Sequence, residues 1–372
     1  MVTFWILCFG LLASNLISAQ RSGQRPFSLC TTTDAKSGMC IHLEECKPMV
    51  DILRRQPLTN SDRRYLQQNQ CGSISREIFV CCPQQTFPSD PSKGKRLLPL
   101  PGDCGFSSTD KIIAGKKTVI DEYPWMALLG YTIPGRQKTF SCGGTLINNR
   151  YILTAAHCVN GPNIPSTWFL SSVRLGEWNK TSVRDCELGD CNDSPLDLSI
   201  EDFVVHENYF PYSIDQHNDI ALLRLAQEVS YTRWIAPLCL PVTPDVRNRD
   251  FDGVSLDVSG WGRTENAPES DVKLRARVNG VSLDYCQLIY RNASRRVENS
   301  QICALGENGA DTCTGDSGGP LMGRENPTRG VPYYFQVGIT SYGPTQCGRG
   351  IVPGVYTRVS EYMDWILRNI RP

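Results

Sequence analysis

The stretch Gly315-Asp316-Ser317-Gly318-Gly319-Pro320 places one serine hydroxyl among glycines and beside a carboxylate. Upstream lie Thr154-Ala155-Ala156-His157-Cys158 and Asn218-Asp219-Ile220-Ala221-Leu222-Leu223, so that a histidine, an aspartate and a serine follow one another along the chain. A serine hydroxyl at its ordinary pKa is a poor nucleophile and needs a base to accept its proton. An imidazole can accept it, and a buried carboxylate can fix the tautomer of the ring. The three stretches therefore predict a nucleophile, a base and an orienting acid.

Each of these residues also has an ordinary structural interpretation. His157 could be a packed core histidine, Asp219 a solvated loop acid and Ser317 part of a glycine-rich turn. Cysteines flank the histidine, however, and the apolar run after Asp219 would bury its backbone. Because the structural interpretation needs three separate coincidences, we favour the catalytic one.

Length and composition restrict the partners. The chain has 372 residues with 38 basic and 38 acidic side chains, so its formal net charge is zero. A single hydrophobic core usually stops growing at roughly 250 residues, and we therefore expect two domains. No long run of either charge occurs, which argues against a nucleic-acid partner and against a membrane surface held by charge.

Residues 1–19 form a short apolar run that ends in Ile17-Ser18-Ala19. This pattern predicts a secretory signal peptide, because a membrane anchor would need about 20 apolar residues. Its removal takes Cys8 from the seventeen cysteines and leaves sixteen for an oxidising compartment. We expect disulfides rather than zinc, since the four histidines are not paired with cysteines at short regular spacing.

Six of these cysteines cluster between residues 30 and 82. So short a segment cannot bury enough apolar surface to fold unaided, and covalent links must restrict its unfolded chain. Spacing alone leaves their pairing open. The alternatives for this segment are a docking or regulatory module and an inert propeptide. Prolines after it predict an extended linker that proteases can reach: Pro88, Pro91, Pro99 and Pro101.

From residue 112 onward, short apolar and β-branched runs alternate with turn residues. Tyr151–Thr154, Val173–Leu175 and Phe335–Ile339 are typical of strands in a closed barrel or a sandwich. The C-terminal segment differs, because apolar residues recur there at helical spacing. These residues are Val359, Tyr362, Met363, Ile366 and Leu367.

The three motifs of the opening stretches resemble those of the trypsin-like serine proteases, from about Ile112 to the C-terminus. The cysteine spacing that ends in Cys81-Cys82-Pro83 resembles the clip domain of arthropod serine proteases. The resemblance implies an all-β fold of two six-stranded antiparallel β-barrels with a C-terminal helix, after a small disulfide-rich clip domain. The expected parts are a signal peptide at 1–19, the clip domain at 29–82, a linker and activation region at 83–111, and the protease domain at 112–372.

The resemblance also implies the disulfide pairing. It joins the first clip cysteine to the fifth, the second to the fourth and the third to the sixth. The implied bridges are Cys30–Cys81, Cys40–Cys71, Cys46–Cys82, Cys104–Cys239, Cys142–Cys158, Cys186–Cys191, Cys286–Cys303 and Cys313–Cys347.

Specificity follows from the residue six positions before the serine. In the family this position, here Asp311, forms the floor of the primary pocket, where a carboxylate selects Lys or Arg; an ordinary surface acid is the alternative. Gly343 and Gly354 match wall positions that admit a long side chain. Ser341 and Gly343 are expected to pair with the substrate backbone as an added strand. The N–H groups of Gly315 and Ser317 are expected to form the oxyanion hole.

Asp110-Lys111-Ile112-Ile113-Ala114-Gly115 resembles an activation site. Cleavage after Lys111 would free the α-amino group of Ile112, and Asp316 is its expected partner in a buried ion pair. The Cys104–Cys239 bridge would keep the clip domain attached after the cut.

Two surface features remain. Val173-Arg174-Leu175-Gly176-Glu177-Trp178-Asn179 resembles the start of a calcium loop, with an acidic surface loop as the alternative. Glu177 and Asp185 by side chain, and Asn179 and Ser182 by backbone carbonyl, are the candidate structural Ca²⁺ ligands; the chemistry itself needs no cofactor. Asn179 and Asn292 begin N-glycosylation sequons.

These observations predict a secreted zymogen of a serine endopeptidase that acts in the haemolymph. By resemblance, its partners are prophenoloxidase, a Spätzle-like precursor or a downstream clip protease as substrate, together with an upstream activating protease and a serpin inhibitor. A role in dorsoventral patterning is an alternative, and so is a non-catalytic scaffold or regulator.

Overall fold

The computed structural model describes residues 29–34, 36–43, 46–53, 58–74, 77–83, 91–107, 116–187, 189–263, 267, 269–306, 316–327, 330–344 and 352–372. The chain divides into two compact units, Met1–Pro83 and Gln84–Pro372. No helix in these ranges is long and apolar enough to cross a membrane.

The first unit is a four-stranded antiparallel sheet with two helices. The strand order is β1 (Leu29–Thr31), β2 (Ser37–His42), β4 (Glu77–Pro83) and β3 (Gln70–Ile74), and the helices are α1 (Lys47–Leu53) and α2 (Asn60–Gln68). Thr59 begins α2 with a capping box, in which its hydroxyl accepts from the N–H of Asp62 and the Asp62 carboxylate accepts from the N–H of Thr59. Disulfides in this unit join Cys30 to Cys81, Cys40 to Cys71 and Cys46 to Cys82, the pairs that the resemblance implies.

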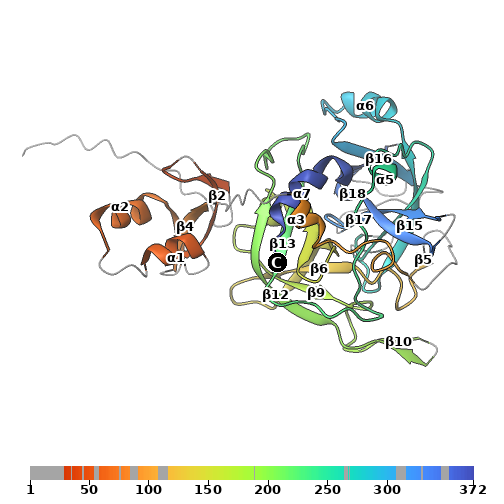
Figure 1. The fold of residues 1–372 in the computed structure, drawn as a ribbon, viewed down its shortest axis with the longest axis horizontal. Coiled ribbons are helices and arrows are strands. Elements are labelled where there is room, and N and C mark those ends of the chain that lie inside the picture. The colour runs from red at the N-terminus through yellow and green to blue at the C-terminus, as the bar shows by residue number, and fades with distance from the viewer. Residues whose placement is uncertain are drawn as a thin grey trace, which may run out of the picture. The chain divides into compact units, whose positions relative to one another are not determined.

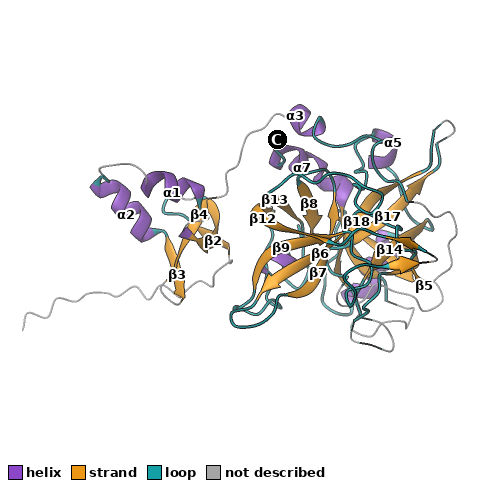
Figure 2. Ribbon diagram, turned by 90° about the horizontal axis from the view of Figure 1, so that it is seen from below, coloured by secondary structure: helices purple, strands orange, loops and turns teal. Residues whose placement is uncertain are grey.

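The second unit contains two β-barrels (Figure 1, Figure 2). The first barrel closes in the order β12 (Leu196–Val205), β13 (Ala221–Leu225), β8 (Tyr151–Thr154), β7 (Thr139–Leu146), β6 (Met126–Thr132) and β9 (Phe169–Leu175). The second runs β14 (Ser255–Gly260), β17 (Pro320–Glu325), β18 (Tyr333–Tyr342), β19 (Gly354–Arg358), β16 (Gln301–Gly306) and β15 (Leu274–Val281); β14 also pairs with β15, and β5 (Lys116–Lys117) extends the sheet. The predicted all-β class with two six-stranded barrels is confirmed.

Helices and one hairpin complete this unit. The helices are α3 (Pro91–Lys95), α4 (His157–Asn160), α5 (Pro244–Arg247), α6 (Leu283–Arg291) and α7 (Met363–Asn369), with a 3₁₀ turn η3 (Val359–Tyr362) before α7. The predicted apolar stripe at the C-terminus is therefore shared between η3 and α7, and its residues are buried. The short hairpin of β10 (Cys186–Glu187) and β11 (Asp190–Cys191) projects from the barrels (Figure 1).

The expectation of an extended linker was wrong for its described part. Pro91 begins helix α3, where its fixed φ suits the first helical position. The helix packs against α7 (Figure 1, Figure 2), and Gly94 is buried there. A Cβ atom at Gly94 would lie 2.0 Å from the carbonyl oxygen of Leu367, so only glycine allows this contact. Leu98 is also buried.

Candidate active site

The register of the first barrel brings His157 and Asp219 together. Strand β13 pairs antiparallel with β8, and Ala221 lies opposite Thr154. The residues just before β13 therefore meet those just after β8. Asp219 precedes β13, and His157 opens helix α4 after β8. Two segments more than sixty residues apart thus supply one hydrogen-bonded pair.

The pair is closely bonded and buried. The Asp219 carboxylate lies 2.7 Å from His157 Nδ1 through Oδ2, and its Oδ1 accepts from the His157 backbone N–H at 2.8 Å. The Asp219 side chain is fully buried, whereas that of His157 is 17% exposed. The imidazole is therefore oriented by the acid and still faces solvent.

The carboxylate also fixes the electrostatics of the ring. Burial lowers the pKa of His157, but the charge of Asp219 and its hydrogen bond raise it, and the net pKa lies above the ordinary value of 6.5. An imidazole with a raised pKa accepts a proton more readily, as a general base must.

Two further hydroxyls hold Asp219, and neither stands in one of the catalytic motifs. Ser341 Oγ donates to Asp219 Oδ2 at 2.5 Å, and Thr357 Oγ1 donates to the Asp219 carbonyl at 2.8 Å. Both come from the second barrel, on β18 and β19. Ser341 was predicted only as a backbone partner of substrate. Its position next to an expected substrate strand was the one available signal.

Ser317 lies in a tight turn against the first barrel. Its carbonyl accepts from the N–H of Gly143 at 2.8 Å, and the Gly319 N–H donates to the Asp316 carbonyl at 2.9 Å. Gly318 has φ +80°. A Cβ atom at Gly318 would lie 2.3 Å from Thr154 Oγ1 and 2.5 Å from the Gly143 carbonyl oxygen. The glycine after the serine therefore lets this turn approach the barrel that carries His157.

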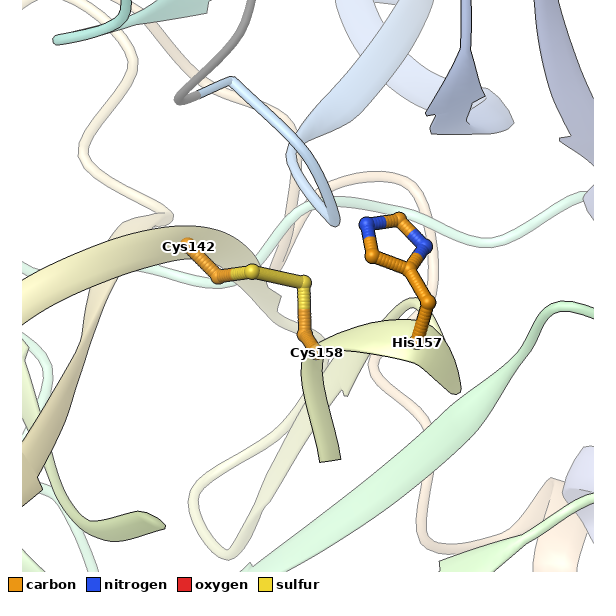
Figure 3. Close-up of side chains that lie close together, drawn as sticks. All are labelled: Cys142, His157 and Cys158. Carbon is orange, nitrogen blue, oxygen red and sulfur yellow. A yellow bond between two sulfur atoms is a disulfide. The ribbon is translucent and has the colours of Figure 1, made fainter. Parts of the chain in front are cut away.

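A disulfide supports the same region. Cys142 and Cys158 are bridged beside the His157 ring (Figure 3). Their sulfurs and a ring nitrogen of His157 lie within 4.8 Å of one another, a spacing that could suggest a metal site. Disulfide sulfur offers no thiolate, so this donor set does not fit a metal ion. The bridge instead fixes the segment that carries the histidine.

Asp316 lies against two glycines of the second barrel. Its Oδ1 accepts from the Gly262 N–H at 2.9 Å. A Cβ atom would lie 2.0 Å from this carboxylate at Gly260 and 2.6 Å at Gly262. Neither glycine stands in a motif that predicts this contact. Lys111 and Ile112 lie outside the described residues, so the ion pair expected of Asp316 stays a prediction.

The expected specificity pocket is described in part. A Cβ atom at Gly343 would lie 3.6 Å from the Cα of Gly354, so the two expected wall glycines lie beside each other. Asp311, Gly315, Cys313 and Cys347 lie outside the described residues. The pocket floor, the first oxyanion donor and the last disulfide therefore stay predictions.

The candidate calcium ligands lie close together. Glu177 and Asp185 are almost fully buried. Glu177 accepts from Arg174 Nη1 at 3.1 Å, and Asp185 Oδ2 accepts from the Asn179 N–H at 3.1 Å. Ser182 Oγ donates to the carboxylate of Asp185 and, at 3.2 Å, to the Asn179 carbonyl.

The structure also describes three further expected disulfides and both predicted glycosylation sites. Cys104–Cys239, Cys186–Cys191 and Cys286–Cys303 are bridged, as the resemblance implies. Asn292 is exposed at the end of α6. Asn179 Oδ1 accepts from Thr181 Oγ1 at 2.8 Å within its sequon.

Comparisons with known proteins agree with this architecture. The trypsin family model matches residues 112–366, and the model of the regulatory CLIP domain of proteinases matches residues 30–82. The chain is 45% identical to Serine protease ea of Drosophila melanogaster, over 92% of the chain and 91% of that protein. It is 41% identical to Melanization protease 1 of the same organism, over 99% and 97%.

A solved structure is also similar. The Drosophila Grass clip serine protease of the Toll pathway matches with a TM-score of 0.64 and 33% identity, over 92% of this chain and 97% of that one. Proteases of the trypsin family need no cofactor for their chemistry. The chain therefore belongs to the clip-domain serine proteases of the trypsin family.

Proposed function

We propose that the chain is a secreted serine endopeptidase zymogen that is activated by cleavage after Lys111 and then cuts proteins after Arg or Lys. The observation that carries the proposal is the buried Asp219 carboxylate, bonded at once to His157 Nδ1 and to Ser341 Oγ. This arrangement leaves the other ring nitrogen of His157 to act as a base toward Ser317.

The reaction follows from these groups. Ser317 Oγ attacks the scissile carbonyl carbon while His157 Nε2 takes its proton, and the N–H groups of Gly315 and Ser317 bind the oxyanion. Losing one such donor typically costs on the order of 3 kcal/mol in the transition state. His157 then gives the proton to the leaving amine, and water hydrolyses the acyl-enzyme in the same way.

Specificity and activation complete the proposal. Asp311 would pair with a substrate Arg or Lys that enters between Gly343 and Gly354. The new ammonium of Ile112 would pair with Asp316. The carboxylate of Asp316 lies close against Gly260 and Gly262 and accepts from the Gly262 N–H. Removing one member of such a buried pair typically costs about 3–5 kcal/mol.

The place in a cascade rests on the relatives. Their names include Melanization protease 1, Spaetzle-processing enzyme and Phenoloxidase-activating factor 1, the last two at 39% identity. We propose prophenoloxidase, a Spätzle-like precursor or another clip protease as substrate, with an upstream protease as activator and a serpin as inhibitor. A patterning role is the alternative.

The decisive test is hydrolysis of a small Arg amide by the purified chain after exposure to trypsin. Cleaved wild-type protein should hydrolyse the amide, and Ser317→Ala should not. Lys111→Gln should stay inactive under the same exposure; full activity of Lys111→Gln would overturn the activation step. If cleaved wild-type protein is inactive, the non-catalytic scaffold is the better function.

We also propose that Glu177, Asn179, Ser182 and Asp185 hold a structural Ca²⁺ ion. The Glu177 and Asp185 side chains are buried, and oxygen ligands suit this hard cation. Burial raises the pKa of Glu177, Arg174 opposes that shift, and the charge of Asp185 adds to it. A bound cation would relieve this repulsion. Calcium should therefore raise the melting temperature relative to EDTA, and Glu177→Gln should remove the increment. An equal increment in the variant would contradict the site.

A further inference from the structure

Strand β18 has an open edge beside the proposed nucleophile. It pairs with β17 as far as Ile339, which lies opposite Pro320. The next bonds on that side join Gly318 N–H to the Thr340 carbonyl and Thr340 N–H to the Gly319 carbonyl, both at 2.9 Å. Beyond Thr340, none of the described strands borders this side of β18, whereas β19 covers the other side up to Tyr342. A peptide added along this edge would start at the serine turn.

Tyr342 stands on this edge, and an arginine covers its ring. The Arg295 guanidinium carbon lies 4.4 Å from the centroid of the ring. Tyr290 packs edge-on against the same ring at 5.6 Å and anchors itself by donating to the Pro353 carbonyl at 2.6 Å. A guanidinium over an aromatic face is held by cation–π attraction.

Backbone contacts fix the position of Arg295. Its N–H donates to the Tyr290 carbonyl at 3.1 Å, and its guanidinium donates to the carbonyl of Ile214. The next residue is held to the same loop, since the Arg296 N–H donates to Asp215 Oδ1 at 2.8 Å. The Arg295 side chain is therefore held in position before any substrate binds. This limits the conformational entropy that is lost on binding.

The charge of Arg295 has no neutralising contact within the described part of the chain. None of its guanidinium nitrogens lies within 4.0 Å of a carboxylate there. Of the nearby acids, Asp215 Oδ1 accepts from the backbone N–H of Arg296 at 2.8 Å, and the Glu298 carboxylate lies 3.8 Å from His217 Nδ1. A positive group thus stands beside the edge where a peptide would lie.

We infer that Arg295 is a specificity-determining residue that selects an acidic side chain three or four positions before the scissile bond. The inference rests on the proposed function, because it needs a peptide bound along Ser341–Gly343. A strand advances about 3.3 Å per residue and alternates its side chains, so one of these two positions faces the ring of Tyr342. The charge-assisted pair that forms there would use guanidinium N–H groups of Arg295 other than the one that donates to the Ile214 carbonyl.

The test compares four-residue Arg amides that carry Glu, Gln or Lys at the third or fourth position before the cut. Wild-type protein should prefer Glu over Gln by about fivefold in kcat/KM, the scale of a partly exposed ion pair. Arg295→Ala should reduce this ratio to about one. Arg295→Glu should invert the preference toward Lys. Added salt should weaken the wild-type preference.

Arg291→Ala is the matched control, because Arg291 is an exposed arginine one turn earlier at the end of α6. It should keep the wild-type ratio. An unchanged Glu/Gln ratio in Arg295→Ala, or an equal loss in Arg291→Ala, would overturn the inference. Binding of the same peptides to Ser317→Ala gives a readout that does not need turnover. It separates a failure of this inference from a failure of the proposed catalytic function.

Discussion

The two units of the chain are stabilised in different ways. In the clip unit the described buried apolar side chains form two small clusters, and most members are disulfide-bonded cysteines, with Met49, Phe79 and Val80 among the rest. In the protease unit whole strands are buried, as in β8 and β13. Helix α2 of the clip unit has no buried residue.

This difference shows which unit depends on covalent links. A small unit buries too little surface to offset its chain entropy, so cross-links must restrict its unfolded state. The protease unit has cores of its own, and there a bridge such as Cys142–Cys158 positions the site. A change that unfolds the clip unit should therefore leave catalysis by the protease unit intact, and a change in the site should leave the clip unit folded.

The largest effect should come from removing Asp219, the acid that the protease unit buries beside His157. Asp219→Asn should lower kcat by about 10,000-fold, because it leaves the imidazole in the wrong tautomer. The clip unit should stay folded. The measurement is amide hydrolysis by the cleaved protein with limited proteolysis of the clip unit, and the exposed Asp252→Asn is the control. A loss below tenfold would mean that Asp219 does not orient His157.

Opening one disulfide of the clip unit tests whether that unit depends on covalent links. The double change Cys40→Ser and Cys71→Ser opens a bridge with a sequence separation of 31 residues. It should cost about 2–5 kcal/mol and unfold the clip unit. Amide hydrolysis by the cleaved protease should stay unchanged. Denaturant unfolding followed by protease sensitivity measures the first effect, and a parallel loss of activity would show that the units are coupled.

A packing change in the protease unit should have a smaller effect. Gly94→Val places side-chain atoms against the backbone of Leu367 and should destabilise the contact of α3 with α7 by about 1–3 kcal/mol. Lys93→Ala, on an exposed position of the same helix, is the matched control. Thermal unfolding of the two variants measures the difference. Equal melting temperatures would mean that α3 does not depend on this close approach.

The smallest expected effect is a shift along the pH axis. Since the pKa of His157 is raised, kcat/KM should increase with pH through that raised value, and Asp219→Asn should lower the pKa. The ion pair of protonated His157 with Asp219 should contribute fully to the stability of the fold below pH 6.5. This contribution should be lost as the pH rises through the raised pKa of His157 in the folded protein. An NMR titration of His157 in Ser317→Ala, with and without Asp219→Asn, measures the pKa of the imidazole. Identical pKa values in the two proteins would contradict the pairing of His157 with Asp219.

Local motifs predicted the residues that carry the proposed chemistry, because His157, Asp219 and Ser317 each stand in a distinctive stretch. They also identified the fold class. The support of Asp219 by Ser341 and Thr357 could not be predicted, since it depends on strands from the other barrel. The linker helix was missed because its prolines suggested an extended chain, whereas its packing depends on a distant backbone carbonyl.

The Cys104–Cys239 bridge would affect how often the cleaved protease meets its substrates. It spans 135 residues of sequence, and Gly105 adds hydrogen bonds to Pro237 and Tyr334 at 2.8 Å each. A cut after Lys111 would therefore leave the clip unit covalently tied to the protease unit. Any surface that captures the clip unit would then hold the protease at an effective concentration set by the tether rather than by the amount of free enzyme. Substrates on that surface would be cleaved first.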